Sequence, residues 1–441
     1  MNLFASRLFA VLTGFLLALP AAAEVQIKEV TTPAGITAWL VEDHSIPFTA
    51  LELRFRGGTS LDVPGKRGAI YLMTALLEEG AGDLDARAYA RALESLAASF
   101  KYSANDDFVS ISAKFLTENR DAAMALLRNT IHHTRFDQEA IDRVRGQVVS
   151  SLMSDAQDPD WMARSSFSRM AFGDHPYGSE GEGTVETVSG LTRDDMLAAR
   201  GAVLARDRMY VGAVGDISPE ELGVLVDQLL ADLPATGAPI PGPAKVQITG
   251  GTTVIEFDTP QSVAMFGQRG IARDDDDFFA AYVLNQILGG GSFESRLMDE
   301  VREKRGLTYG VYSYLVPKDL AAVYLGSVSS ANDRIAEAIA VIRDEWQKMA
   351  STGVTEQELQ DAKTYLTGAY PLRFDGNGRI ANIMVGMQMQ DLPIDYIATR
   401  NSKVEAVTLE DVNRVAAELL DPDGLQFIVV GKPEGLATVT D

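Results

Sequence analysis

The sequence predicts an α+β fold of two tandem, homologous sandwich domains, each with an antiparallel-rich sheet and helices on one face. Three observations predict it. Two segments repeat at a fixed spacing, a proline-rich linker separates the halves, and strand-like segments open each half before helical ones follow. At 441 residues the chain is also too long for one ordinary core.

Two helix–turn–strand segments match without a gap at a spacing of 216 residues. The first runs from Thr192 to Gly215, and the second runs from Thr408 to Gly431. Each opens with a threonine followed three residues later by an acid, which is a helix-capping pattern, and each ends in a short apolar strand. A match across helix, turn and strand indicates an internal duplication.

The first 23 residues have the pattern of a secretory signal peptide. Arg7 precedes an apolar run, and three alanines precede a cleavage point near Ala23–Glu24. The apolar run is short for a membrane-spanning helix, which disfavours the alternative of an uncleaved anchor. We therefore expect an exported protein, periplasmic after cleavage of residues 1–23, with no stable membrane anchor.

Prolines and glycines between positions 234 and 243 indicate a semi-rigid connection. We place the first domain at 24–235, the linker at 236–247 and the second domain at 248–441. Residues of high β-propensity predict strands over 25–30, 36–41 and 51–55 in the first domain and over 253–257 and 262–267 in the second.

Helical periodicity follows these strands in the second domain. One apolar stripe at helical spacing consists of Ile335, Ile339, Ile342, Trp346 and Met349. Thr355 and Glu358 form a capping box for the next helix, which is expected to bury Leu359, Ala362, Tyr365 and Leu366.

The chain is strongly acidic. It has 39 basic and 62 acidic residues, a net charge of −23, which becomes −24 when Arg7 leaves with the signal peptide. This charge argues against nucleic-acid binding and favours basic or neutral peptide partners. Because the chain has no cysteine, its fold cannot rely on disulfides, and thiolate catalysis is excluded.

The segment from Gly289 to Leu315 contains the main candidate site. Glycines 289–291 predict a turn, Phe293, Leu297 and Val301 recur at helical spacing, and Gly306 stands at the expected helix end before a strand over 307–315. The guanidinium of Arg302 and the phenol of Tyr309 could therefore converge on one carbonyl or carboxylate. The alternative is that Arg302 caps helix carbonyls, Tyr309 packs in a core and the glycines form a plain tight turn.

Other catalytic classes lack a supporting pattern. The four histidines are His44, His132, His133 and His175; the adjacent pair points about 100° apart on a helix and cannot chelate one ion as residues i and i+4 do. No nucleophile elbow indicates a serine hydrolase, and no Gly-Lys-Ser/Thr follows glycines 289–291 to make a phosphate loop.

The layout of nearly the whole mature chain resembles the insulinase–pitrilysin family of zinc peptidases, which includes the mitochondrial processing peptidase. Members carry an inverted zinc motif, H-x-x-E-H, on a helix after a segment like the one at 56–68 here. The resemblance implies a clamshell of two domains. In this chain the motif positions hold Tyr71, Thr74 and Ala75, which we expect together on the helix face opposite the buried one. These residues supply neither imidazole ligands nor a carboxylate base.

The third ligand in that family is a glutamate on a later helix, and the corresponding segment 140–152 contains none. In contrast, Arg302-Glu-Lys-Arg-Gly-Leu-Thr-Tyr309 matches the family string R-E-K-x-G-L-x-Y. The resemblance implies that Arg302 and Tyr309 hold substrate and transition state beside a zinc site. It also implies that Gly289, Gly290 and Gly291 let an extended peptide approach.

Selective loss of the zinc residues predicts a non-catalytic subunit of a heteromeric zinc peptidase. This chain would hold no cofactor and be inactive alone, while a homologous partner would supply zinc for metalloendopeptidase activity on peptides. Two alternatives stay open: a peptide-binding or chaperone-like periplasmic module without proteolysis, and a scaffold subunit of a larger assembly.

Overall fold

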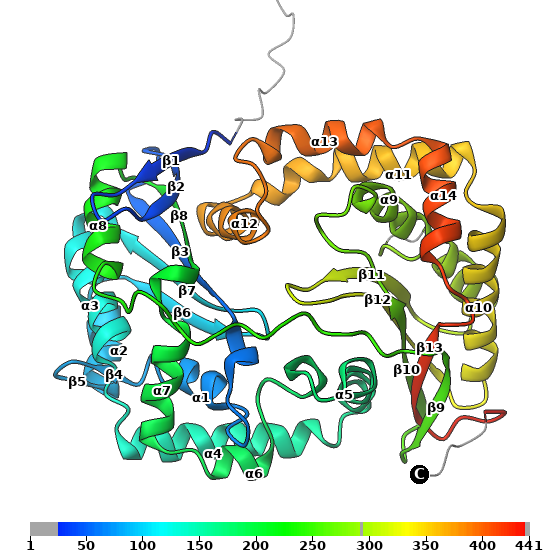
Figure 1. Ribbon diagram of the computed structural model, residues 1–441, viewed down its shortest axis with the longest axis horizontal. Coiled ribbons are helices and arrows are strands. Elements are labelled where there is room, and N and C mark those ends of the chain that lie inside the picture. Colours follow the sequence, from blue (N-terminus) through cyan, green and yellow to red (C-terminus); the bar gives the residue numbers. More distant parts are fainter. Residues whose placement is uncertain (1–24, 292–293, 437–441) are drawn as a thin grey trace, which may run out of the picture.

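The computed structural model describes residues 25–291 and 294–436, which form two halves that lie side by side (Figure 1). Each half contains one main sheet and a layer of helices. The expected signal peptide and Phe293 lie outside the described residues. The predicted α+β two-domain fold is confirmed, and residues 236–247 between the two sheets contain no helix or strand.

The first half has a six-stranded sheet in the order β1-β2-β8-β3-β7-β6. Its strands pair antiparallel except β2 and β8, which run parallel. Every inner residue of β3 is buried, because this central strand is covered on both faces. The strands are β1 (Lys28–Thr31), β2 (Thr37–Glu42), β3 (Phe48–Arg56), β6 (Ser99–Ala104), β7 (Phe108–Leu116) and β8 (Met209–Gly215).

Helices cover one face of this sheet and share one apolar core with it. They are α1 (Ala69–Ala75), α2 (Ala86–Ser95), α3 (Arg120–His133), α4 (Gln138–Asp155), α6 (Val185–Ser189), α7 (Arg193–Val203) and α8 (Pro219–Leu230). A small hairpin of β4 (Gly80–Ala81) and β5 (Leu84–Asp85) precedes α2.

The second half has a five-stranded sheet in the order β11-β12-β10-β13-β9. Its pairs are antiparallel except β9 and β13. The strands are β9 (Gly251–Glu256), β10 (Gln261–Arg269), β11 (Val311–Pro317), β12 (Ala322–Ala331) and β13 (Gln426–Gly431). Its own helices are α9 (Phe278–Leu288), α10 (Ile335–Thr352), α11 (Glu356–Gly368), α13 (Tyr396–Ala406) and α14 (Leu409–Leu419).

The prediction that helices cover one face of each sheet holds for the helices of each half, and one further feature was not predicted. The second face of each sheet is covered by a helix from the other half, as the positions of α5 and α12 in Figure 1 show. Helix α5 (Pro159–Phe172) packs on β10 and β13, and α12 (Asn377–Met389) packs on β3 and β8. Both sheets are therefore buried on two sides, which explains why β3 and β10 read as nearly continuous apolar or buried runs.

Local sequence signals placed most elements correctly. Thr192, Thr355 and Thr408 each form the predicted capping box at the start of α7, α11 and α14. The apolar stripe of α10 is buried along its whole length. Tyr365 is an exception, because its side chain is 51% exposed rather than packed against the core.

Within the described ranges, none of the helices combines the length and apolar character that crossing a lipid bilayer requires.

Candidate functional site

Glycines 289–291 follow the end of α9 and are close-packed at two of their three positions. A side chain at Gly289 would lie 2.4 Å from Ser313 Oγ, and one at Gly290 would lie 2.6 Å from Gln286 Cα. Gly291 has open space around it and a φ of +87°, which favours glycine for conformational reasons alone. The turn is therefore dictated by local packing, and a role for these glycines in peptide binding stays a prediction.

Arg302 lies in a π-helical segment, Met298–Glu303, where the sequence predicted an ordinary α-helix. Leu297 and Val301 are buried as their spacing predicted. Gly306 ends the helix with φ +60°: its N–H donates to the Arg302 carbonyl at 2.7 Å, and the next N–H donates to the Val301 carbonyl at 3.0 Å. The Arg302 side chain is 32% exposed, with its Nε 3.6 Å from Glu303 Oε1.

Tyr309 lies before the strand rather than on it, because β11 begins at Val311 and not at Leu307. Thr308 holds the turn: its Oγ1 lies 2.7 Å from the Ser329 carbonyl oxygen, and it accepts the Gly310 N–H at 3.0 Å. The Tyr309 side chain is 89% exposed. This exposure contradicts the alternative in which Tyr309 packs in a core, and it leaves the phenol open to a ligand or a second chain.

Exposed tyrosines continue along β11. Tyr312 and Tyr314 are two positions apart and therefore lie on the same face of the strand, where they are 44% and 42% exposed. Among the strands described, β11 pairs only with β12. Its other edge is partly covered, because the Ser313 N–H donates to the Gly289 carbonyl at 2.9 Å and the Val311 N–H donates to Met298 Sδ at 3.5 Å.

Helix α1 carries the three positions where a zinc motif was expected and found missing. Tyr71 and Ala75 are partly buried, whereas Thr74 is only 3% exposed and its hydroxyl donates to the Ile70 carbonyl at 2.7 Å. The prediction that Thr74 shares the open face with Tyr71 and Ala75 is therefore wrong. A hydroxyl bound into its own helix is even less suited to act as a base.

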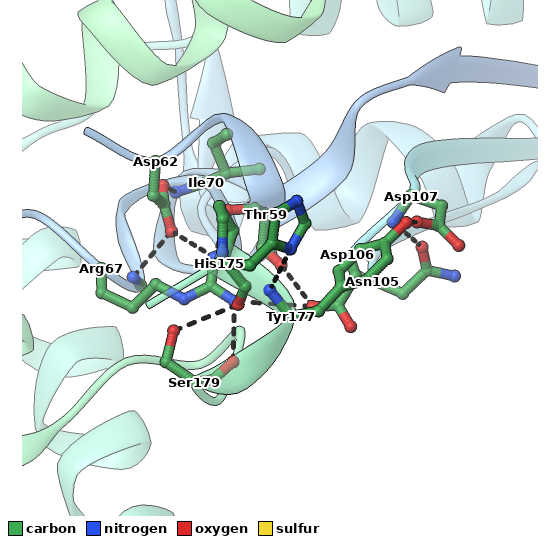
Figure 2. Close-up of polar contacts among 12 residues, drawn as sticks. Thr59, Asp62, Arg67, Ile70, Asn105, Asp106, Asp107, His175, Tyr177 and Ser179 are labelled. Atoms are coloured by element: carbon green, nitrogen blue, oxygen red, sulfur yellow. Dashed lines mark hydrogen bonds and ion pairs between the residues drawn. The ribbon is translucent and has the colours of Figure 1, made fainter. Parts of the chain in front are cut away.

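The segment before α1 forms a compact polar network that fixes the helix start (Figure 2). The Asp62 carboxylate accepts the N–H groups of Gly68 at 2.8 Å and Ile70 at 2.9 Å, and burial raises its pKa to about 6. Arg67 donates to the carbonyls of Pro176 at 3.0 Å and Ser179 at 2.9 Å. The contacts of Asp62 and Arg67 thus hold the start of α1 in place, although α1 itself carries no metal ligand.

The histidines are scattered. His44 Nδ1 lies 2.6 Å from Asp216 Oδ1, His132 and His133 occupy the last turn of α3, and His175 accepts the Tyr177 N–H at 3.2 Å. Across residues 25–291 and 294–436, no group of three or more His, Cys, Asp or Glu side chains is arranged to hold a metal ion.

Contacts between the β11–β12 turn and the first half were not predicted from the sequence. Lys318 Nζ lies 2.5 Å from Asp106 Oδ2, and its ammonium stands 4.1 Å from the centre of the Tyr177 ring. Tyr177 donates to Asp107 and accepts the Leu320 N–H at 3.1 Å. These residues are 70 to 212 positions apart, and no local pattern in the sequence links them.

Comparison with family models gives two adjacent matches. A model described as insulinase (peptidase family M16) matches residues 38–184, and one described as peptidase M16 inactive domain matches residues 190–366.

Curated relatives match over most of the chain. One is the non-peptidase homolog YmxG of Helicobacter pylori, 26% identical over 390 residues, which covers 88% of this chain and 90% of the relative. Another is the uncharacterized zinc protease SCO5738 of Streptomyces coelicolor, 26% identical over 411 residues, covering 89% and 87%.

Solved structures share the fold. A crystal structure titled as a peptidase M16 inactive domain from Pseudomonas fluorescens matches with a TM-score of 0.87 and 28% identity, covering 94% of this chain and all of that one. A protease from Helicobacter pylori matches with a TM-score of 0.83 at 17% identity, covering 92% of this chain and 99% of that chain.

Proposed function

Because the chain belongs to peptidase family M16, the insulinase family, we propose that it is the non-catalytic, substrate-binding subunit of a two-chain zinc peptidase. A homologous partner would carry the zinc ion, its ligands and the glutamate base. This chain would carry substrate contacts made by Arg302 and Tyr309.

The observation that carries the proposal is a contrast between two sites. At the first, Tyr71, Thr74 and Ala75 replace every residue of the zinc motif, and Thr74 is buried. At the second, the Arg302–Tyr309 string is complete and Tyr309 is 89% exposed with no packing role. A tyrosine combines an apolar ring with a hydrogen-bonding hydroxyl and is enriched at interfaces, which supports a binding role.

The chemistry assigned to this chain needs only hydrogen-bond donors. A guanidinium can donate two parallel hydrogen bonds to a peptide carbonyl or a carboxylate, which fixes the orientation of the bound group. A phenol donates to the oxygen that gains negative charge when the carbonyl is attacked. The partner's zinc, when bound, would supply the activated water.

Export is part of the proposal. The N-terminal pattern of Arg7, an apolar run and three alanines supports delivery to the periplasm, where the partner would also have to be exported. Peptides that are basic or neutral suit a mature chain of net charge −24, since like charge repels acidic ones.

The first test compares the purified mature chain with and without its partner. We expect no peptide hydrolysis and no stoichiometric zinc in the chain alone, and hydrolysis in the mixture. Stoichiometric zinc and robust peptidase activity in the chain alone would overturn the proposal.

The second test isolates Tyr309 in the assembled enzyme. Tyr309→Phe removes one donor to the transition state, so we expect kcat to fall about 10²-fold. Tyr365→Phe, also an exposed tyrosine, is the matched control and should leave kcat unchanged. An equal rate for Tyr309→Phe and Tyr365→Phe would remove Tyr309 from the mechanism.

A second candidate function is peptide binding without proteolysis, which the exposed side chains of Tyr309, Tyr312 and Tyr314 favour. Its signature would be binding of extended basic peptides to the isolated chain, measured by calorimetry, without any partner. Binding that requires the partner would favour the subunit role instead.

A further inference from the structure

A cavity of about 350 Å³ lies at the contact between the two halves, beside α1. Helix α5 and the loop at 179–182 form one wall, and β10, β11 and β12 form the other. Part of its polar rim, including Thr59, Asp106 and Tyr177, is visible in Figure 2. The volume is at the lower end for a small-molecule site and suits a ligand the size of an amino acid.

Most of the wall is apolar or aromatic. Phe167 and Phe172 come from α5, Met265 from β10 and Tyr314 from β11. Tyr71, at the position where the family motif would have its first histidine, closes the side toward α1. The face of α1 that lacks a metal site thus helps to line the cavity.

The cavity also holds charges that the protein does not neutralise. Lys318 and Asp106 form an ion pair with each other. In contrast, Arg164 makes no hydrogen bond or ion pair with any part of the chain that the structure describes, and within the same limits Glu180 and Glu182 have no ion pair. One cation and two carboxylates therefore line the cavity without a direct ion pair, and Arg164 acts electrostatically on Glu180 and on Asp160.

These charges lie near one another. Burial raises the pKa of Glu180, Glu182 raises it further by repulsion, and Arg164 opposes the increase. Arg164 likewise lowers the pKa of Tyr314 against the effect of burial, so it is close to both sides of the cavity. Glu182 acts electrostatically on Tyr71. A ligand inside would contact the cation and the carboxylates together.

We propose that this cavity binds a free α-amino acid as a zwitterion, with an aromatic or large aliphatic side chain. The ligand's carboxylate pairs with the Arg164 guanidinium, whose fork suits two carboxylate oxygens. Its ammonium group lies between Glu180 and Glu182, and its side chain packs against Phe167, Phe172 and Met265. Neither zinc nor a partner chain is required, so the site goes beyond the proposed subunit function.

The test of the ligand class uses the purified mature chain alone and equilibrium dialysis with labelled L-phenylalanine. We expect saturable binding at one site. N-acetyl-L-phenylalanine lacks the ammonium and L-phenylalaninamide lacks the carboxylate, so each should compete at least about tenfold more weakly than L-phenylalanine or L-leucine. Absence of saturable binding at millimolar ligand, or equal competition by either blocked compound, would overturn the proposal.

The test of the site uses charge-removing variants, each with a control at a nearby position in the chain. Arg164→Gln and Glu182→Gln should each weaken L-phenylalanine binding by at least about tenfold. Arg169→Gln, an exposed arginine of α5 that does not line the cavity, and Glu186→Gln should bind as the wild type does. Wild-type affinity in both cavity variants would place the ligand elsewhere.

Because these measurements use no partner, their failure leaves the subunit proposal intact. Conversely, a peptidase-active mixture with no amino-acid binding would support the subunit proposal and refute this one.

Discussion

The carboxyl group of Glu52, on β3, is buried where the sheet of the first half meets α12. It is 4% exposed, and burial raises its pKa to about 7 against a hydrogen bond from Ser112 and the charge of Arg54. Arg54 is held in turn by α12, donating to Asn382 Oδ1 at 2.6 Å. Because burial changes the pKa of this carboxyl group, the free energy of unfolding depends on pH.

The sign of this effect follows from proton binding. The pKa of Glu52 is 4.5 in an unfolded chain and about 7 in the folded one, so the folded state binds more protons between these values. The free energy of unfolding therefore falls as pH rises through that window. Asp62 and Asp319, whose pKa values burial raises from 3.8 to about 6, act in the same direction.

We predict that Glu52→Gln flattens this decline. The slope of the unfolding free energy against pH should become smaller by up to about 1.4 kcal/mol per pH unit between pH 5 and pH 7, since one titrating group is removed. Urea unfolding at a series of pH values measures it. Glu29→Gln, an exposed carboxyl on β1, is the control, and an unchanged slope in Glu52→Gln would contradict the burial argument.

The two helices that cross between the halves bind their sheets with different chemistry. On α5 the contact is apolar: Ala163, Phe167 and Ala171 pack with Val263, Met265, Ile428 and Val430. On α12 an apolar patch against Trp39 and Val214 adjoins a polar one, where Gln388 donates to the Val211 carbonyl at 2.9 Å. The α5 contact should therefore contribute most of the stability that joins the halves.

We predict that Phe167→Ala costs about 3–5 kcal/mol of unfolding free energy, because the ring is 2% exposed and its loss leaves a cavity under β10. Met170→Ala on the same helix, at a residue that is 37% exposed, should change stability by no more than about 0.5 kcal/mol. Denaturant unfolding followed by circular dichroism compares them. A loss below about 1 kcal/mol in Phe167→Ala would mean that α5 is not a main attachment.

At the scale of the whole molecule, the turn between β11 and β12 reaches from the second half to the first. Asp319 pairs with Arg56 Nε at 3.1 Å, Lys318 pairs with Asp106, and Leu320 donates its N–H to the Tyr177 hydroxyl. The contacts join the β11–β12 turn to the end of β3, the β6–β7 turn and the loop after α5. They hold the halves in one arrangement along the candidate cavity.

We predict that Tyr177→Phe loosens this turn without unfolding the protein. Loss of the hydroxyl removes the acceptor for the Leu320 N–H, worth about 1 kcal/mol, so its amide exchange should accelerate about fivefold. Hydrogen exchange read by mass spectrometry measures this, with Tyr365→Phe as the control. Equal exchange in both variants would show that the hydroxyl does not hold the turn.

Local patterns were enough to predict much of the fold. The capping threonines, the apolar stripe of α10, the buried strands and Gly306 as a helix end all depend on neighbours within a few residues, and the structure confirms each of them. The missing zinc ligands at 71, 74 and 75 needed only residue identity. The two-domain α+β class followed from the order of these elements.

Three features required the tertiary structure. Thr74 is buried, although its position in the sequence had predicted an open helix face. Tyr309 is exposed and lies before β11, although the sequence had predicted that it lies on the strand. The second face of each sheet is covered by a helix from the other half, which no local periodicity encodes. The cavity joins Tyr71, Arg164, Glu182 and Tyr314 from separate elements.

The sequence by itself determined the elements of this protein, its M16-like motifs and the absence of zinc ligands, since these depend on residue type and short spacing. Only the tertiary structure decided which side chains face solvent, which face the other half and which unpaired charges share a cavity. The physical reason is that burial and electrostatic environment are set by contacts between residues far apart in the chain.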